Sequence, residues 1–260
     1  MTVLSDRFEG GAAPYWNRFA VGRAWVVEQA NSLNLVVGPA PAGSLSDAEL
    51  NDHRLYERGH WVWRPPLRLT VRARASHGSG ALKGTAGFGF WNSPFAGDGS
   101  AADSPQAVWF FYASPESHMT LSADGHGSGW RAQVLNAPSV PRWTVVIANQ
   151  LWRISPLRSL LFRAAQAQVG GGEGIIASRF DEWHTYRLDW LRARVVFFVD
   201  GQPIFRAASS PRGPLGFVAW MDNSVLSLRA GGMASGNTAV MEHQWLELSE
   251  VTIEPLSSDA

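Results

Sequence analysis

The chain has 260 residues, no cysteine and a formal net charge of zero. The missing cysteines exclude disulfides, thiolate metal sites and thiol catalysis, and the balanced charge argues against general nucleic-acid binding. Thirteen tryptophans, 13 phenylalanines and 26 glycines are typical of twisted β-sheets with many turns. The length admits one large all-β domain, and we expect a single domain over residues 1–260.

The first third of the chain predicts short strands and one long loop. Strands are expected around Trp16 and Phe19, at 24–27 and at 33–37. Residues 38–58 are predicted as a loop because Pro39, Pro41 and Gly43 interrupt them. Within that loop, residues 46–50 are compatible with one helical turn that begins at an N-cap.

Residues 67–75 alternate between apolar and polar side chains, which predicts a half-buried antiparallel strand. Strands are also expected at 84–92 and 107–113, and the second is apolar on both faces, so we place it inside a sheet. Further strands are predicted at 130–135, 179–190, 195–199, 215–221, 224–230 and 245–253. Many short strands with turn signals indicate a sandwich or jelly roll, followed by a flexible tail at 255–260.

One segment departs from the β pattern. Residues 125–172 contain no acidic residue and five arginines, which predicts a basic insert. Pro156 and Gly170 are start and stop signals for an amphipathic helix over about 156–169, and Gly170–Gly172 is expected to be a flexible loop. The helix would pack on the edge of the sandwich; alternatively, it would form a lid over an apolar cleft or contact a membrane surface. The residues assigned to those contacts are Leu157, Leu161, Phe162, Arg158 and Arg163.

The stretch Trp183–Phe205 reads WHTYRLDWLRARVVFFVDGQPIF, with an Asp200-Gly201 hairpin turn between its last two strands. It resembles a signature hairpin of the concanavalin A-like lectin/glucanase superfamily. Weaker support comes from the sequence GFGFWN at 87–92. The resemblance implies an all-β, concanavalin A-like jelly-roll sandwich of two antiparallel sheets with one inserted amphipathic helix.

Among enzymes, the chain is most similar to the family 16 glycoside hydrolases, which carry a Glu-x-Asp-x-x-Glu motif on one strand. A retaining mechanism needs two carboxyl groups about 5–5.5 Å apart. The strand after GFGFWN should hold the motif, but residues 106–113 read QAVWFFYA, and the motif occurs nowhere in the chain. We therefore do not expect retaining glycosidase chemistry of this kind.

In place of the motif, the resemblance implies an aromatic concave face able to bind a ligand, with either alternate face of 107–113 lining the cleft. The predicted ligand-binding residues are Trp91, Asn92, Trp109, Phe111, Trp220 and Asn223. Candidates for acid–base or polarising roles, if a reaction occurs there, are Asp222, Tyr112, His118, Glu116, Asp52 and His53.

Three functional hypotheses follow. The preferred one is a binding domain for a glycan or glycoside. The alternatives are a non-hydrolase enzyme for an apolar small molecule, with residues 151–169 as a lid, and a peripheral membrane or complex subunit that docks through the same helix.

We expect no cofactor and no nucleic-acid partner. Candidate ligands for a structural calcium, by residue type only, are Asp98, Asp103 and Asp222–Asn223, although the last pair is typical of a turn. The N-terminus has no basic and apolar regions of a signal peptide, which predicts a cytoplasmic protein; a leader already removed would give the same pattern.

Overall fold

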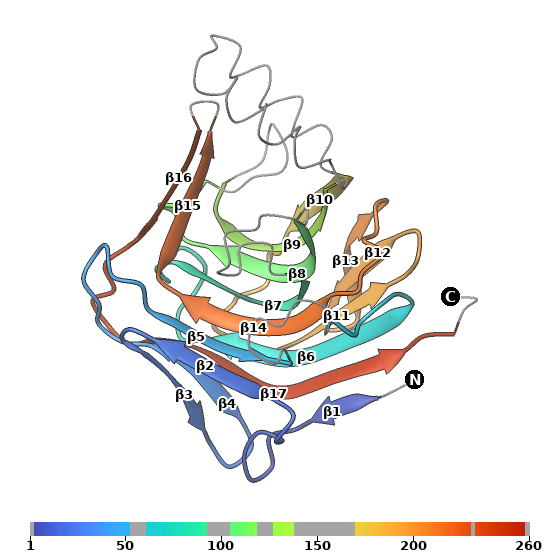
Figure 1. Ribbon diagram of the computed structural model, residues 1–260, viewed down its shortest axis with the longest axis horizontal. Helices are drawn as coiled ribbons and strands as arrows, with labels where there is room; N and C mark the ends of the chain where they lie inside the picture. The colour runs from blue at the N-terminus through green and yellow to red at the C-terminus, as the bar shows by residue number, and fades with distance from the viewer. Residues whose placement is uncertain are drawn as a thin grey trace.

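The computed structural model describes residues 3–52, 61–92, 105–118, 127–137, 170–229 and 232–257. These residues form a sandwich of two antiparallel sheets and contain no α-helix (Figure 1). The predicted all-β sandwich is confirmed, whereas the helix expected at 156–169 lies outside the described residues. No helix in the described part of the chain is long and apolar enough to cross a membrane.

The first sheet has eight strands, in the order β13-β12-β11-β6-β17-β4-β3 with β1 beside β17. Its strands are β1 (Leu4–Asp6), β3 (Ala24–Glu28), β4 (Leu33–Val37), β6 (Leu67–Ala75), β11 (His184–Trp190), β12 (Val195–Val199), β13 (Gln202–Ala207) and β17 (Gln244–Pro255). Strand β6 alternates buried and more exposed residues as its sequence predicts.

The second sheet has seven strands, in the order β10-β9-β8-β7-β14-β5-β2. Its strands are β2 (Asn17–Val21), β5 (Asp47–Asn51), β7 (Thr85–Trp91), β8 (Gln106–Ala113), β9 (Gly129–Asn136), β10 (Gly170–Ile175) and β14 (Gly216–Asp222). A hairpin of β15 (Ser224–Arg229) and β16 (Gly232–Asn237) follows β14 and rises away from both sheets (Figure 1).

The main core lies between the sheets and is rich in aromatic rings. Phe88 of β7 and Phe110 of β8 contact Tyr186 of β11, each with ring centroids 5.2 Å apart. Trp130 of β9 stacks on Phe180 at 4.1 Å. Strand β8 lies inside its sheet and is buried on both faces, as its uninterrupted apolar sequence predicts.

The signature hairpin forms where the sequence predicts it. Asp200 and Gly201 both have positive φ, 49° and 80°, which is the backbone that a tight two-residue turn needs. The Asp200 carboxylate accepts a hydrogen bond from the Thr185 amide at 2.9 Å and lies 2.6 Å from Nδ1 of His184. The turn is thereby attached to β11, the first strand of the motif.

Two local predictions are wrong. Residues 46–50 do not form a helical turn, because 47–51 is strand β5, which pairs with both β14 and β2. Ala48 and Leu50 are fully buried while Asp47 and Glu49 point to the opposite face. A period-two pattern that pairs with two strands outweighs the local helix-capping signal.

The second correction concerns Gly170–Gly172, which begins strand β10 instead of forming a loop. A Cβ atom at Gly172 would lie 3.0 Å from the Phe205 ring, and one at Gly174 would lie 2.8 Å from it. Glycine therefore lets the edge of one sheet approach Phe205 of β13 at the edge of the other. The glycines reflect close packing and not flexibility.

Candidate functional site

A second apolar cluster lies on the outer face of the seven-stranded sheet, separate from the main core. Side chains alternate along β8, so Phe110 and Tyr112 enter the core while Trp109 and Phe111 lie on the other face. The cluster consists of Ala107, Trp109, Phe111, Ala113, Val218 and Trp220, with Trp91 and Leu135 packed against it. The structure thus identifies Trp109 and Phe111 as the outer residues of β8.

Four of these rings form one continuous surface, the aromatic floor, consisting of Trp91, Trp109, Phe111 and Trp220. Trp109 stacks on Phe111 with centroids 5.4 Å apart and lies 5.2 Å from Trp220 and 5.9 Å from Trp91. Gly87 of β7 makes room for them, because a Cβ atom there would lie 2.7 Å from the Trp220 ring. The glycines of GFGFWN therefore let indole rings lie directly on the strand.

A pocket of about 200 Å³ opens over this floor. Its lining combines the four rings with Thr85, the carboxylates of Glu49 and Asp222, and Ser224 and Leu226 of β15. Pockets for drug-sized ligands are typically about 300–1,000 Å³, so this one matches a single small ring.

Strands β5 and β14 bring three carboxyl groups to the same face. Their register places Asp47 opposite Asp222 and Glu49 opposite Trp220. The Asp222 carboxylate accepts hydrogen bonds from the Thr85 amide at 3.1 Å, the Thr85 hydroxyl at 3.0 Å and the Ser224 amide at 2.8 Å. We call Asp47, Glu49 and Asp222 the acidic wall.

Burial is the largest influence on the pKa values of the three carboxyl groups in the acidic wall. It raises the pKa of Asp222 to about 7, against the hydrogen bonds from Ser224 and Thr85, which lower it. Burial also raises the pKa of Glu49, and it raises that of Asp47 well above its ordinary value, with the charges of Glu49 and Asp222 adding to the effect. The wall can therefore both accept and donate hydrogen bonds near neutral pH.

Two buried polar atoms at the site lack a hydrogen-bond partner among the residues that the structure describes. They are Nε1 of Trp91, in the aromatic floor, and Oδ1 of Asp47, in the acidic wall. Unsatisfied buried polar atoms are uncommon in folded proteins, and a bound ligand is one way to satisfy them.

A hydrogen-bonded chain supports the other side of the floor. Nε1 of Trp109 donates to the Gln133 side chain at 2.8 Å, and Gln133 donates to Glu173 at 3.3 Å. Glu173 also forms a 3.1 Å ion pair with Arg131, and both side chains are buried. This chain fixes the Trp109 ring from strands β9 and β10.

The structure brings together five of the predicted site residues: Trp91, Trp109, Phe111, Trp220 and Asp222. Asn223 is fully buried, and its amide donates to the carbonyls of Ser44 and Thr238, both at 2.9 Å. Asn92 accepts a 3.0 Å hydrogen bond from the Gln106 amide, beside the start of β8. Asn223 therefore holds neighbouring backbone segments together, and Asn92 fixes the backbone at the start of β8.

The other predicted polar candidates lie elsewhere. The Tyr112 hydroxyl donates to the Leu82 carbonyl inside the core at 3.0 Å, and Glu116 pairs with Lys83. Asp52 accepts hydrogen bonds from the Phe217 amide at 2.8 Å and from the Trp63 indole.

His118 bridges to β15 through its backbone, which donates to the Leu226 carbonyl at 2.9 Å. It therefore supports the strand that forms one side of the pocket. The predicted residue His53 and the contact residues Leu157, Arg158, Leu161, Phe162 and Arg163 lie outside the described residues.

Sequence reasoning missed Asp47 and Glu49, because it assigned them to a loop with a helical turn. The alternation of polar and apolar residues through 47–51 is the signal that could have found them. Among the described residues no group of His, Cys, Asp and Glu has the arrangement of a metal site. Of the calcium candidates, Asp98 and Asp103 lie outside the described residues, and Asp222–Asn223 joins β14 to β15.

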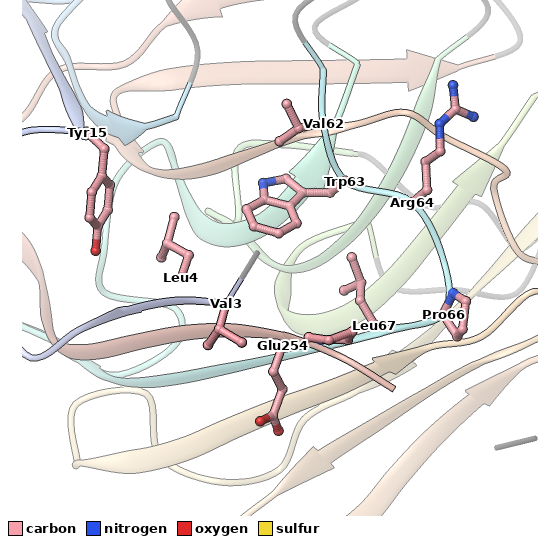
Figure 2. Close-up of a pocket in the computed structure, with 10 residues that line it drawn as sticks. Val3, Leu4, Tyr15, Val62, Trp63, Arg64, Pro66, Leu67 and Glu254 are labelled. Atoms are coloured by element: carbon pink, nitrogen blue, oxygen red, sulfur yellow. The ribbon is translucent and has the colours of Figure 1, made fainter. Parts of the chain in front are cut away.

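A larger pocket, of about 540 Å³, lies beside β1 and the end of β17. Figure 2 shows Trp63, Leu4 and Leu67 around it, with the charged groups of Arg64 and Glu254 directed away. Its lining is mainly apolar and lacks the facing carboxylates of the aromatic pocket. The convergence of rings and acids therefore favours the smaller pocket as the functional site.

Several solved structures align with almost the whole length of this chain. A prokaryotic β-1,3-1,4-glucanase (lichenase) from a mouse hindgut metagenome aligns with a TM-score of 0.55 and 11% identity, covering 98% of this chain and 100% of the other. The Bacillus licheniformis β-glucanase gives 0.54 and 11%, covering 98% of each chain. The endo-β-1,3-glucanase from Pyrococcus furiosus gives 0.51 and 11%, covering 97% and 93%.

No protein-family model matches the sequence, and the search of curated proteins found no match. The likeness to these structures therefore lies in the architecture and not in shared residues. On that architecture, this chain has the concanavalin A-like lectin/glucanase fold.

Proposed function

We propose that this protein binds a glycan or glycoside on the outer face of its seven-stranded sheet. The observation that carries the proposal is the convergence of the aromatic floor and the acidic wall in one pocket the size of a sugar ring. The glucanase names of the solved structures with this fold agree with a carbohydrate ligand.

The two parts of the pocket match the two surfaces of a sugar. The apolar C–H face of a pyranose packs against the face of an aromatic ring, as Trp91 and Trp220 would allow. Its hydroxyls donate to carboxylates, and Glu49 and Asp222 lie beside the rings to accept. The indole N–H of Trp91, which has no acceptor among the described residues, would serve a sugar oxygen.

We propose binding and not hydrolysis of the family 16 type. The four outer positions of β8 are Ala107, Trp109, Phe111 and Ala113, so this strand presents rings and small side chains where the resembling enzymes need carboxyl groups. The acids of the pocket lie on β14 and β5, which are two and three strands away from β8.

A glycan array followed by calorimetry tests the proposal. We expect Trp91→Ala and Trp220→Ala to weaken binding of any array ligand at least tenfold, which corresponds to about 1.4 kcal/mol. Trp25→Ala is the matched control, because Trp25 is 39% exposed on β3 of the other sheet. Thermal melts of each variant separate lost binding from lost folding.

Two outcomes contradict the proposal. One is the absence of any bound glycan across the array. The other is an equal loss of affinity in the Trp25 variant and in the two floor variants. Release of reducing ends from a bound glycan would show that the protein is a hydrolase using acids other than those of the family 16 motif.

A further inference from the structure

We infer that the ring bound in this pocket carries a protonated amine, so that the ligand is an amino sugar or its glycoside. The inference rests on the proposed function and adds the charge class of the ligand. Its basis is the acidic wall, which faces the aromatic floor and forms no ion pair with a lysine, arginine or histidine of the described residues.

The acidic wall differs from three other acids of the chain whose side chains are largely buried. Asp189 pairs with Arg68 at 2.7 Å, Glu247 with Arg74 at 2.8 Å and Glu173 with Arg131 at 3.1 Å. No lysine, arginine or histidine in the described part of the chain pairs with the acidic wall.

Hydrogen bonds to the acidic wall stabilise its negative charge only in part. Asp222 accepts three hydrogen bonds on Oδ1, from Thr85 and Ser224. Glu49 accepts one on Oε2 from Asn51 at 3.0 Å and is also hydrogen-bonded to the Asp47 carboxyl group. Thr85, Ser224 and Asn51 are uncharged, so none of these hydrogen bonds brings a positive charge to the acidic wall. A buried carboxylate is costly without a counter-ion, and a cationic ligand would supply one.

The aromatic floor favours the same ligand. The faces of tryptophan and phenylalanine carry negative potential and attract a cation that lies within about 6 Å of the ring centroid. Trp109, Phe111 and Trp220 pack with centroids 5.2–5.8 Å apart, so one ammonium group over them would approach more than one ring. Aromatic faces around a pocket are a recognised arrangement for binding ammonium groups, and carboxylates beside them would add hydrogen-bond acceptors.

Other ligand charges fit this pocket less well. A neutral sugar would bring no counter-ion to the ionised form of the acidic wall, and a uronic acid would be repelled by that form. A metal ion in place of the amine is not supported, because the described residues hold no group with the arrangement of a metal site. The volume of about 200 Å³ suits one ring bearing one amine.

The test compares matched methyl glycosides at pH 7. The probes are the glucosaminide and galactosaminide, their neutral glucoside and galactoside, and their N-acetyl derivatives. Dissociation constants come from NMR titration of the tryptophan indole signals. We expect an amino glycoside to bind at least tenfold more tightly than its neutral and acetylated counterparts.

The variant Glu49→Gln with Asp222→Asn should remove this preference, so that an amino glycoside and its neutral counterpart bind the variant with affinities within threefold of each other. Both changes keep the shape of the side chain and an oxygen acceptor, so the fold should survive. Glu182→Gln is the control for general charge, because this side chain is 56% exposed and pairs with Arg179 away from the site.

The outcomes separate the inference from the proposed function. Equal or weaker binding of the amino glycosides, or an unchanged preference in the double variant, overturns the inference and leaves glycan binding standing. The same holds if the array yields a neutral or acidic ligand and no amino glycoside binds. An array without any ligand overturns both.

Discussion

Nε1 of Trp220 donates a 2.9 Å hydrogen bond to the Thr85 hydroxyl, which in turn donates to the Asp222 carboxylate at 3.0 Å. Thr85 therefore fixes one ring of the aromatic floor and one member of the acidic wall at the same time. The residues lie on neighbouring strands, with Thr85 opposite Asp222 and Trp220 opposite Gly87. The orientation of Trp220 relative to Asp222 depends in part on this hydroxyl.

Thr85→Val tests that dependence, because valine keeps the shape but removes both hydrogen bonds. We expect a loss of about 1–3 kcal/mol in the free energy of unfolding, since the Trp220 N–H loses its buried acceptor. Affinity for a glycan ligand should fall about fivefold or more. Denaturant unfolding and calorimetry measure the two effects.

Thr252→Val is the matched control. The Thr252 hydroxyl contacts that of Ser5 at 3.1 Å on an exposed part of the eight-stranded sheet, so its loss should cost little. If both variants bind the glycan as the original protein does, the hydroxyl does not orient the site.

The acidic wall predicts how stability depends on pH. The pKa of Asp222 is about 7 in the folded protein, above its ordinary value of 3.8, so between these values the folded state holds a proton that the unfolded state releases. Stability therefore falls as pH rises from about 4 to 7, and the cost is fully present above pH 7. Asp47 and Glu49 lie on the same face and also have raised pKa values, so their ionisation likewise lowers stability as pH rises.

Asp222→Asn should remove this dependence. We expect the variant to be more stable than the original by about 2–4 kcal/mol at pH 8 and to differ little at pH 4. Thermal unfolding across pH 4–8 measures the difference. A variant that is equally destabilised at both pH values would show that the Asp222 charge is not strained by burial and that its hydrogen bonds dominate.

Gly87 of β7 lies close to the Trp220 ring, and a substitution can test this packing. In Gly87→Ala the new Cβ would lie 2.7 Å from the Trp220 ring and 2.2 Å from the Phe110 carbonyl oxygen. We expect a loss of about 1–3 kcal/mol of stability together with displacement of the Trp220 ring. Unfolding measurements and the tryptophan fluorescence spectrum report the two effects.

Gly236→Ala provides the comparison, because a Cβ there would lie 3.9 Å from Val225, an ordinary contact. This change on β16 should be nearly neutral. Equal stability of the two variants would mean that the floor can shift to accept a methyl group.

The positions of many strands and of the signature hairpin could be predicted from the sequence, because side-chain alternation and turn chemistry are local signals. The alternation of 67–75 and the Asp200-Gly201 turn are confirmed as β6 and the β12–β13 hairpin. Prediction from the sequence failed at 47–51 and at 170–175, where the strands depend on contacts with residues far away in the sequence. Strand β5 is defined by pairing with β14, and the glycines of β10 by contact with Phe205.

In the candidate site, the aromatic residues could be predicted from local apolar patterns, whereas the acidic residues could not. The aromatic residues on β8 and β14 follow from apolar strands within a sandwich, and the structure brings Trp109 and Trp220 together. The acidic wall could not be predicted once β5 was assigned to a loop. Its members meet only through the register that places Asp47 opposite Asp222.

The buried pair of Arg131 and Glu173 supports the floor through Gln133, which accepts the Trp109 hydrogen bond. Glu173→Leu would leave the fully buried Arg131 side chain without this carboxylate, and we expect a loss of about 3–5 kcal/mol. Arg131→Met combined with Glu173→Leu removes both charges, so the double variant should recover a large part of that loss. Chemical unfolding of the two single variants and the double variant gives the coupling free energy. Additive costs would contradict the predicted coupling, and the Trp109 indole NMR signal would show whether the floor moves with the pair.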